Sequence, residues 1–108
     1  FESVHFYKNQ YKDTTFVNTS FDETVLNNMV FQDILFDENL ARNVKMTDTT
    51  FKNVNFKNVE VDNASFENVK FKNCAFDNVV IKNATMSQKL INELQKQHVE
   101  LENVQPSK

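Results

Sequence analysis

The segment from Phe51 to Met86 reads FKNVN FKNVE VDNAS FENVK FKNCA FDNVV IKNAT M, a five-residue unit repeated without a break. The same register extends back to Phe1 with no insertion, and its positions 1, 6, 11 and so on hold all eleven Phe residues of the chain. A core residue at every fifth position fits neither the period of a helix nor the alternation of a strand. A fixed short period of this length predicts a stacked repeat architecture.

The residues around each Phe position, which we call the centre, indicate how one unit folds. Two residues before a centre the chain carries small or branched groups such as Val54 and Val59, and this spacing places both side chains on one face of a strand. Two residues after the centre, ten of seventeen positions are Asn and three are Asp. Asn and Asp tolerate left-handed backbone geometry, so we expect a corner at this position and a chain that winds into a coil.

In these features residues 1–86 resemble the pentapeptide-repeat family in its Phe-centred form. The resemblance implies a right-handed, four-sided β-helix with four units per turn. The expected fold class is therefore an all-β solenoid of about four coils, closed by a C-terminal capping α-helix. The chain uses Val or Thr where the family usually has Ala, and Asn where Gly is common, which suggests slightly wider and stiffer coils.

With four units per turn, centres that lie twenty residues apart should stack in columns. One column should contain Tyr11, Phe31, Phe51 and Phe71, and the next should contain Phe16, Phe36, Phe56 and Phe76. The smallest centre, Ala41, should leave the core locally thin or let a neighbouring side chain fill the space. The first coil is the least regular, with Lys8 at a corner and Asn9 at an inward position.

The five-residue period breaks after Met86, and the apolar positions that follow have helical spacing: Leu90, Ile91, Leu94, His98 and Leu101. We therefore divide the chain into a repeat β-helix at residues 1–86 and a capping helix with a tail at residues 87–108. The helix should lay its apolar stripe across the last coil. A dimerising helix is the alternative, a role that the resemblance implies through the topoisomerase-binding members of the family.

Local signals set the expected ends of this helix. Thr85 followed by Gln88 matches a capping box, so the helix should begin there. Lys96 and Glu100 are four residues apart and should pair on its exposed side. Pro106 lies beyond its predicted end.

Residues 21–40 differ from the other coils at the position just before each centre, which should face solvent. This position is apolar four times in succession, at Val25, Val30, Leu35 and Leu40, which we call the apolar belt. Single exposed aliphatic residues are common on protein surfaces and need no function. The alternative is a contact surface for a partner protein or for a second copy of the chain.

Motifs that carry chemistry are missing from this sequence. Because the chain has no Gly, it has neither a phosphate-binding loop nor a dinucleotide fingerprint. His5 and His98 are far apart and have no metal-ligand spacing with Cys74. Cys74 occupies an inward position, which favours a small core residue over a nucleophile. We expect no catalytic, cofactor or metal site and therefore no enzyme.

Three Asn-X-Ser/Thr triplets begin at Asn18, Asn63 and Asn83. Such triplets arise by chance in a repeat rich in these residues, but they would matter in a lumenal protein. The luminal domain of the synaptic vesicle glycoprotein 2 transporters is similar, with Phe-centred repeats and glycosylated Asn two residues after a centre. The chain has neither a membrane-spanning run nor a signal-peptide pattern, which favours a cytoplasmic location over a lumenal or extracellular one.

Net charge narrows the partners that we expect. At −3, with a pI of about 5.3, the chain is not suited to direct nucleic-acid binding. Our main prediction is a non-catalytic protein-binding or scaffolding module. Its partner is another protein or a second copy of the chain, which would bind through a coil end, the apolar belt or the C-terminal helix. The resemblance also offers a DNA-mimic modulator of a type II topoisomerase, but such relatives have strongly negative faces and this chain carries Lys52, Lys57, Lys72 and Lys82 on its outside. A lumenal receptor-like domain is the third alternative.

Overall fold

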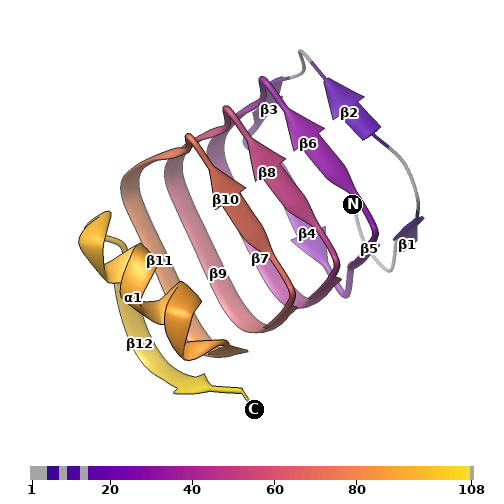
Figure 1. The fold of residues 1–108 in the computed structure, drawn as a ribbon. Coiled ribbons are helices and arrows are strands. Elements are labelled where there is room, and N and C mark those ends of the chain that lie inside the picture. Colours follow the sequence, from indigo (N-terminus) through magenta and orange to yellow (C-terminus); the bar gives the residue numbers. More distant parts are fainter. Residues whose placement is uncertain (1–4, 8–9, 13–14, 108) are drawn as a thin grey trace.

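The computed structural model describes residues 5–7, 10–12 and 15–107, and the side chains of Lys12 and of residues 15–107. It is a β-solenoid in which each coil pairs in parallel with the next (Figure 1). The larger described sheet comprises β1 (His5–Tyr7), β3 (Thr15–Val17), β4 (Ser20–Asp22), β5 (Val25–Asn27), β7 (Leu35–Thr47), β9 (Asn55–Glu67), β11 (Ala75–Met86) and β12 (Glu100–Pro106). The smaller sheet comprises β2 (Gln10–Lys12), β6 (Val30–Gln32), β8 (Thr50–Lys52) and β10 (Lys70–Lys72).

Strand pairing has the predicted register of twenty residues. Phe31 pairs with Phe51 and Phe51 with Phe71 on the smaller sheet, while Phe36 pairs with Phe56 on the larger. Within a column, neighbouring described rings stack with centroids 5.0 to 5.3 Å apart and planes 5 to 9° from parallel. Rings of adjacent columns meet edge to face, a geometry that aromatic quadrupoles favour. The predicted all-β solenoid with stacked Phe columns is confirmed.

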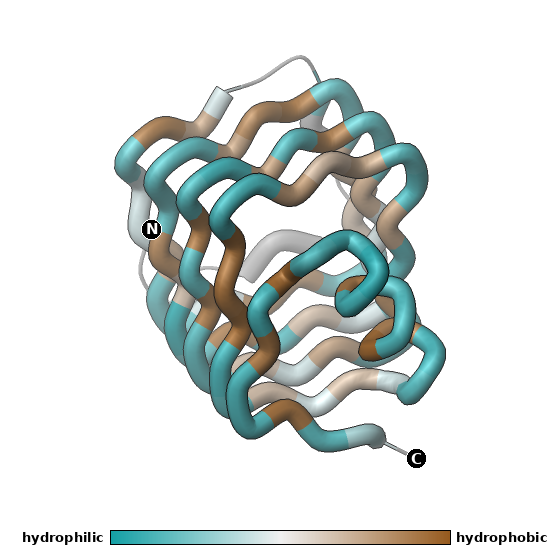
Figure 2. Tube along the Cα trace, turned by 90° about the vertical axis from the view of Figure 1, so that its left-hand side faces the viewer, coloured by the Kyte–Doolittle hydropathy of each residue, from teal (hydrophilic) through white to brown (hydrophobic). Residues whose placement is uncertain are grey.

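Corners form where the Asn pattern places them. The backbone is left-handed, with φ between 50 and 63°, at every fifth residue from Asn18 to Asn83, and again at His98 and Asn103. Asn side chains at successive corners donate hydrogen bonds along the stack, as from Asn73 to Asn53 at 2.7 Å. In Figure 2 the hydrophilic corners of successive coils lie in rows along the stack. Asn therefore both permits the turn and links neighbouring coils.

Inward positions before the centres are filled as expected, although some are polar. Val54 and Thr49 are completely buried, and Thr24 is nearly so. The Thr49 hydroxyl donates to the Thr47 carbonyl at 3.0 Å, and the Thr24 hydroxyl to the Asp22 carbonyl at 3.3 Å. Because each hydroxyl bonds its own corner, Thr is tolerated where Val would otherwise be preferred. The irregular positions Lys8 and Asn9 lie outside the described residues.

The C-terminal helix is shorter than the sequence predicts. Helix α1 runs from Gln88 to Lys96, so His98 and Leu101 lie beyond it. After the helix the chain returns to the repeat register as β12, where Leu101 pairs with Ile81 and Val104 with Ala84. The helix thus replaces two units of a fifth coil without an insertion. Leu101 has helical spacing from Leu94, but backbone pairing with β11 makes it a strand residue.

One further expectation for this segment is wrong for the same reason. Lys96 and Glu100 do not pair on a helix face, because Glu100 opens β12. Pro106 lies beyond the end of α1, as predicted, and it is the last residue of β12, opposite Met86. A proline is acceptable there because β12 is the edge strand of its sheet.

The N-cap of α1 is Ser87 and not the predicted Thr85. The Ser87 hydroxyl accepts a hydrogen bond from the Leu90 backbone amide at 3.1 Å. Thr85 is still in β11, where it pairs with Ser65 and Gln105. Thr85 therefore belongs to strand β11, whereas the sequence pattern placed it at the start of the helix.

Replacing Ser87 by Ala should lower the free energy of unfolding by about 1 kcal/mol, because the Leu90 amide loses its acceptor. Urea denaturation followed by circular dichroism measures this. The control is Thr85→Val, which removes a hydroxyl but keeps a β-branched residue and should change stability little. The reverse order of effects would make Thr85 the cap.

Helix α1 closes the last coil as predicted. Leu90, Ile91 and Leu94 are buried and extend the core beyond Met86. The helix lies across the end of the stack (Figures 1 and 2). The N-cap and a basic last turn, at Lys96, are consistent with a stable short helix. The described residues contain no helix that is long and apolar enough to cross a membrane.

At Ala41 the structure has a locally thin core, the first of the two expected outcomes. A partly open cavity of about 80 Å³ lies among inward side chains between Phe16 and Val61, with Ala41 in its wall.

Candidate protein-interaction surfaces

The apolar belt lies on four different faces of the coil. Val25 is on β5, Val30 on β6, and Leu35 and Leu40 are in successive units of β7. All four are half-buried. Each is flanked in the next coil by a polar residue, in order Lys45, Thr50, Asn55 and Glu60.

The structure therefore does not bring the belt together into one patch. Among the described residues the one large hydrophobic side chain that is well exposed is Val17, at 55%. It lies on β3 beside Asp37, diagonal to Leu35. A contact role for the belt remains a prediction.

The three glycosylation candidates all occupy exposed corners with positive φ. Asn63 and Asn83 lie in one corner column, where the Asn63 amide donates to Asn43 and the Asn83 amide to Asp62. Asn18 belongs to a different column, so the three are not brought together. The Nδ2 atoms of Asn63 and Asn83, where a glycan would attach, are already engaged in side-chain hydrogen bonds, and glycosylation remains a prediction.

Cys74 packs against the core as predicted. Its thiol is half-buried and donates to the Phe51 carbonyl at 3.3 Å. Burial raises the pKa of Cys74, which disfavours the reactive thiolate. His98 is exposed at a corner, and the described residues contain no cluster of His, Cys, Asp or Glu that could hold a metal ion.

One face of the larger sheet carries charges of alternating sign. Arg42 forms a two-pronged ion pair with Asp22, at 3.0 and 2.9 Å, and this hydrogen bonding lowers the pKa of Asp22. Lys82 lies 3.8 Å from Glu60. At the free edge of the sheet the pKa of Glu100 is raised by a hydrogen bond with Glu102 and by repulsion between the two carboxylates. This alternation leaves no sustained run of one sign along the stack.

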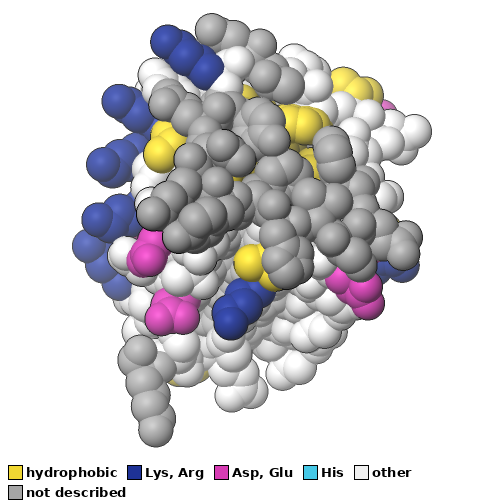
Figure 3. Space-filling model, turned by 90° about the vertical axis from the view of Figure 1, so that its right-hand side faces the viewer, with side chains coloured by type: hydrophobic (Ala, Val, Ile, Leu, Met, Phe, Trp, Pro, Cys, Tyr) yellow, Lys and Arg dark blue, Asp and Glu magenta, His cyan; other side chains and the backbone are white. Residues whose placement is uncertain are grey.

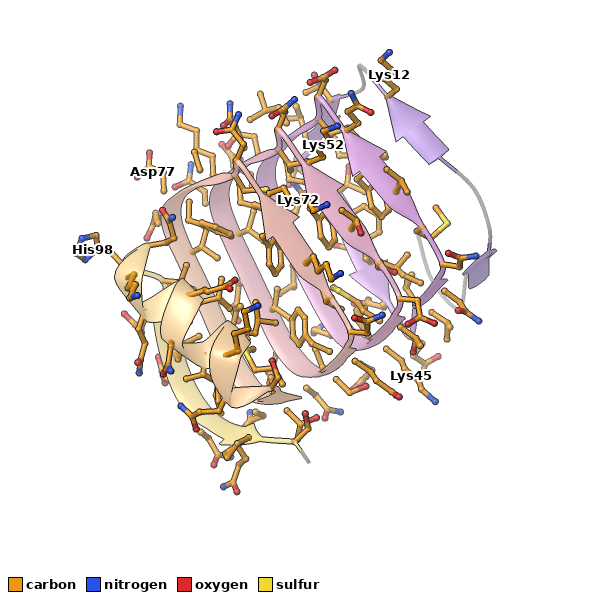
Figure 4. All side chains as sticks on the ribbon, viewed as in Figure 1. Lys12, Lys45, Lys52, Lys72, Asp77 and His98 are labelled. Carbon is orange, nitrogen blue, oxygen red and sulfur yellow. The ribbon has the colours of Figure 1, made fainter. Side chains whose placement is uncertain are left out.

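The smaller sheet is different, because its charged side chains are all basic. Its strands carry Lys12, Lys52, Lys70 and Lys72 at outward positions, and none of these strands contains Asp or Glu. Lys52 and Lys72 are register partners in adjacent coils. We call this sheet surface the lysine face. Figure 4 shows Lys12 on β2, Lys52 on β8 and Lys72 on β10. In Figure 3 basic side chains gather along the edge where this sheet lies.

The lysines in the middle and C-terminal part of this face are available for contacts. Lys52, Lys70 and Lys72 are exposed, and none of the three is within ion-pair distance of a described acidic group. The intervening outward positions, Val30 and Thr50, are uncharged and half-buried. The result is a flat surface with unpaired positive charge.

A groove of about 400 Å³ borders the lysine face, between β10 and α1. The half-buried ring of Phe71 and the side chain of Leu90 form apolar parts of its lining. Lys70, Lys72 and Lys89 supply positive charge to it, and Glu93 supplies one negative charge. The groove exists because α1 does not continue the sheet beside β10.

Sequence reasoning missed the lysine face. It treated Lys52 and Lys72 as part of a scattered set with Lys57 and Lys82. The signal was present, because a twenty-residue period places positions 12, 52 and 72 in one outward column and position 70 beside them. Sorting outward positions into columns, as was done for the centres, would have separated these lysines from Lys57 and Lys82.

Comparison with known proteins agrees with this fold. Residues 1–66 match the family model of the pentapeptide repeat region, and residues 50–88 match the model of pentapeptide repeats in eight copies. The chain therefore belongs to the pentapeptide-repeat proteins. No curated protein matches it significantly.

Two solved structures of trypsin-treated QnrB1, a plasmid-mediated fluoroquinolone resistance protein, are similar at low identity. The first is 10% identical with a TM-score of 0.38, over 87% of this chain and 54% of the other. The second is 11% identical with a TM-score of 0.27, over 72% of this chain and 55% of the other. This chain thus spans about half the length of these structures.

Proposed function

We propose that this pentapeptide-repeat chain is a non-catalytic protein-binding module that binds an acidic protein surface through its lysine face. The observation that carries the proposal is the set of exposed, unpaired lysines at residues 52, 70 and 72 on one flat sheet. Complementary charge speeds encounter and selects partners, and it acts best when the charges are not already neutralised within the protein. Family membership supports the binding role, since repeat solenoids offer extended, rigid surfaces.

The charge distribution supports this proposal over the two nucleic-acid-related alternatives. A net charge of −3 opposes direct binding to a phosphate backbone, which would repel the acidic remainder of the surface. A DNA mimic needs a continuous negative face, whereas Asp22, Arg42, Glu60 and Lys82 alternate in sign on the larger sheet. A protein partner with a local acidic patch is compatible both with the positive lysine face and with the net negative charge of the chain.

The double substitution Lys52→Glu/Lys72→Glu should weaken binding to immobilised poly-L-glutamate at least about tenfold at low salt, equivalent to about 1.4 kcal/mol. The two changes invert the charge at the centre of the lysine face. Surface plasmon resonance across a salt series measures the affinity. Binding by the unaltered chain should weaken as salt rises, because exposed charges are screened.

The matched control is Lys45→Glu/Lys96→Glu, which makes the same change in net charge away from the lysine face. Both lysines are exposed, on β7 and on α1. This variant should lose much less affinity. Equal losses of affinity in the two variants would mean that only net charge matters. Stronger binding to duplex DNA than to poly-L-glutamate would mean that the lysine face binds a nucleic acid. Either result contradicts the proposal.

A further inference from the structure

The core between Phe16 and Val61 contains the partly open cavity beside Ala41. In its column of centres Ala41 follows Phe21 and precedes Val61, and all three are paired in register. A methyl group thus stands where the preceding coil places a ring. The cavity of about 80 Å³ lies next to this substitution.

The described lining of the cavity is almost entirely apolar. It includes the rings of Phe21, Phe36 and Phe51, with Leu26 and Met46. Its polar members are Thr24 and Asn39.

Both polar side chains donate hydrogen bonds to backbone carbonyls and none into the cavity. The Thr24 hydroxyl donates to the Asp22 carbonyl, and the Asn39 amide donates to the Phe16 carbonyl at 3.0 Å. Asn39 Oδ1 is the one buried side-chain polar atom without a partner among the described residues. An ordered water needs about two to four polar partners, so this space does not favour water.

The walls cannot easily collapse into the space. Phe36 stacks on Phe16 and Phe56, and Phe51 stacks on Phe31 and Phe71, all at 5.0 to 5.3 Å. Each ring is also tied to the twenty-residue register of its strand. Moving one ring inward would break two stacks and an edge-to-face contact. Close-packed, interlocked walls of this kind keep a cavity open.

We propose that this cavity is a binding site for one small, uncharged, apolar molecule. An engineered apolar cavity of about 150 Å³ in another protein stays dry and binds benzene or xenon. A space of about half that volume should accept a xenon atom or an apolar guest of similar size. Dispersion contacts with the surrounding rings replace the contacts that the empty space lacks.

Methyl NMR of the full chain under xenon pressure tests this proposal. Xenon should cause saturable shifts of the lining methyl groups of Leu26, Val44, Met46 and Val61. The buried methyl groups of Ile91 and Leu94, beneath the helix, should not follow the same curve. Shifts that do not saturate, or that are equal at both places, would overturn the site.

A filling variant locates the binding. Ala41→Val puts into this column the residue that already occupies it at Val61, and it should reduce the xenon response at least about tenfold while raising the melting temperature. Ala75→Val makes the same chemical change at an exposed position of β11 and should keep the response. A filled variant that still responds fully contradicts the proposal. If that variant does not fold, the titration of the unaltered chain still decides.

Discussion

Truncation after Met86 should leave a chain that is largely unfolded or aggregated at 25 °C. The deletion removes the side chains of Leu90, Ile91 and Leu94, each worth about 1.5–3 kcal/mol when buried. It also uncovers Met86 and removes the strand that pairs with β11. A combined loss on the order of 5 kcal/mol or more would take most of the usual stability of about 5–15 kcal/mol for a domain.

Differential scanning calorimetry and light scattering measure this result. Leu94→Ala supplies an intermediate case: it should keep the fold, cost about 2–5 kcal/mol, and lower the melting temperature by about 4–8 °C for each kcal/mol. Gln95→Ala, exposed on the same helix, should have little effect. If the truncated chain remained monodisperse with an unchanged melting curve, neither α1 nor β12 would be part of the cooperative fold.

Phe51→Ala should lower the free energy of unfolding by about 3–5 kcal/mol. Phe51 is only 3% exposed. Its ring stacks on Phe31 at 5.1 Å and on Phe71 at 5.0 Å, and it meets Phe56 edge to face at 5.5 Å. Removal therefore leaves a cavity in the middle of a column and breaks contacts in three directions. Urea denaturation monitored by far-UV circular dichroism measures the change.

The comparison variant is Phe76→Ala. Phe76 is half-buried and stacks on a single described ring, Phe56, at 5.1 Å. We therefore expect a smaller loss than at Phe51. A cost at Phe51 below about 1 kcal/mol, or one no larger than at Phe76, would show that stacking within the column contributes little to stability.

Most of the fold follows from one property of the sequence, its five-residue period. Phe at the centre, Val or Thr two residues before it, and Asn two residues after it specify the core, the inward neighbour and the corner. Together they predict the column that contains Phe31, Phe51 and Phe71. Each type of position has a local physical cause, burial in the first two cases and left-handed backbone in the third, so no knowledge of distant contacts is needed.

The C-terminal segment could not be read in the same way, because two periods overlap there. Leu101 fits a helix that starts at Leu90, but Val99, Leu101 and Asn103 also repeat the pentapeptide pattern. The choice between them depends on pairing with β11, which lies about twenty residues earlier in the chain. A search for the pattern beyond Met86 in the original register would have found β12.

The candidate sites depend on the sequence in a weaker way. The five-residue period predicts that Val25 and Leu40 lie on different faces. It also predicts that Lys52 and Lys72 lie side by side in adjacent coils. Which of these surfaces binds a partner depends on what that partner presents, and the chain does not encode this in its own packing. Predicting that the lysines form no ion pairs would also require the position of every nearby carboxylate.

The position of α1 has a consequence for polymer growth. A parallel β-stack can in principle lengthen without limit, since each exposed strand edge is a template for another copy of the chain. Here α1 occupies the place that a fifth strand beside β10 would take. Only β12 therefore has a free edge with which a second copy could pair, and this strand contains Glu100, Glu102 and Pro106. An incoming chain could start a coil but could not close it. At this end of the stack, the helix therefore disfavours the addition of a further coil in the same register.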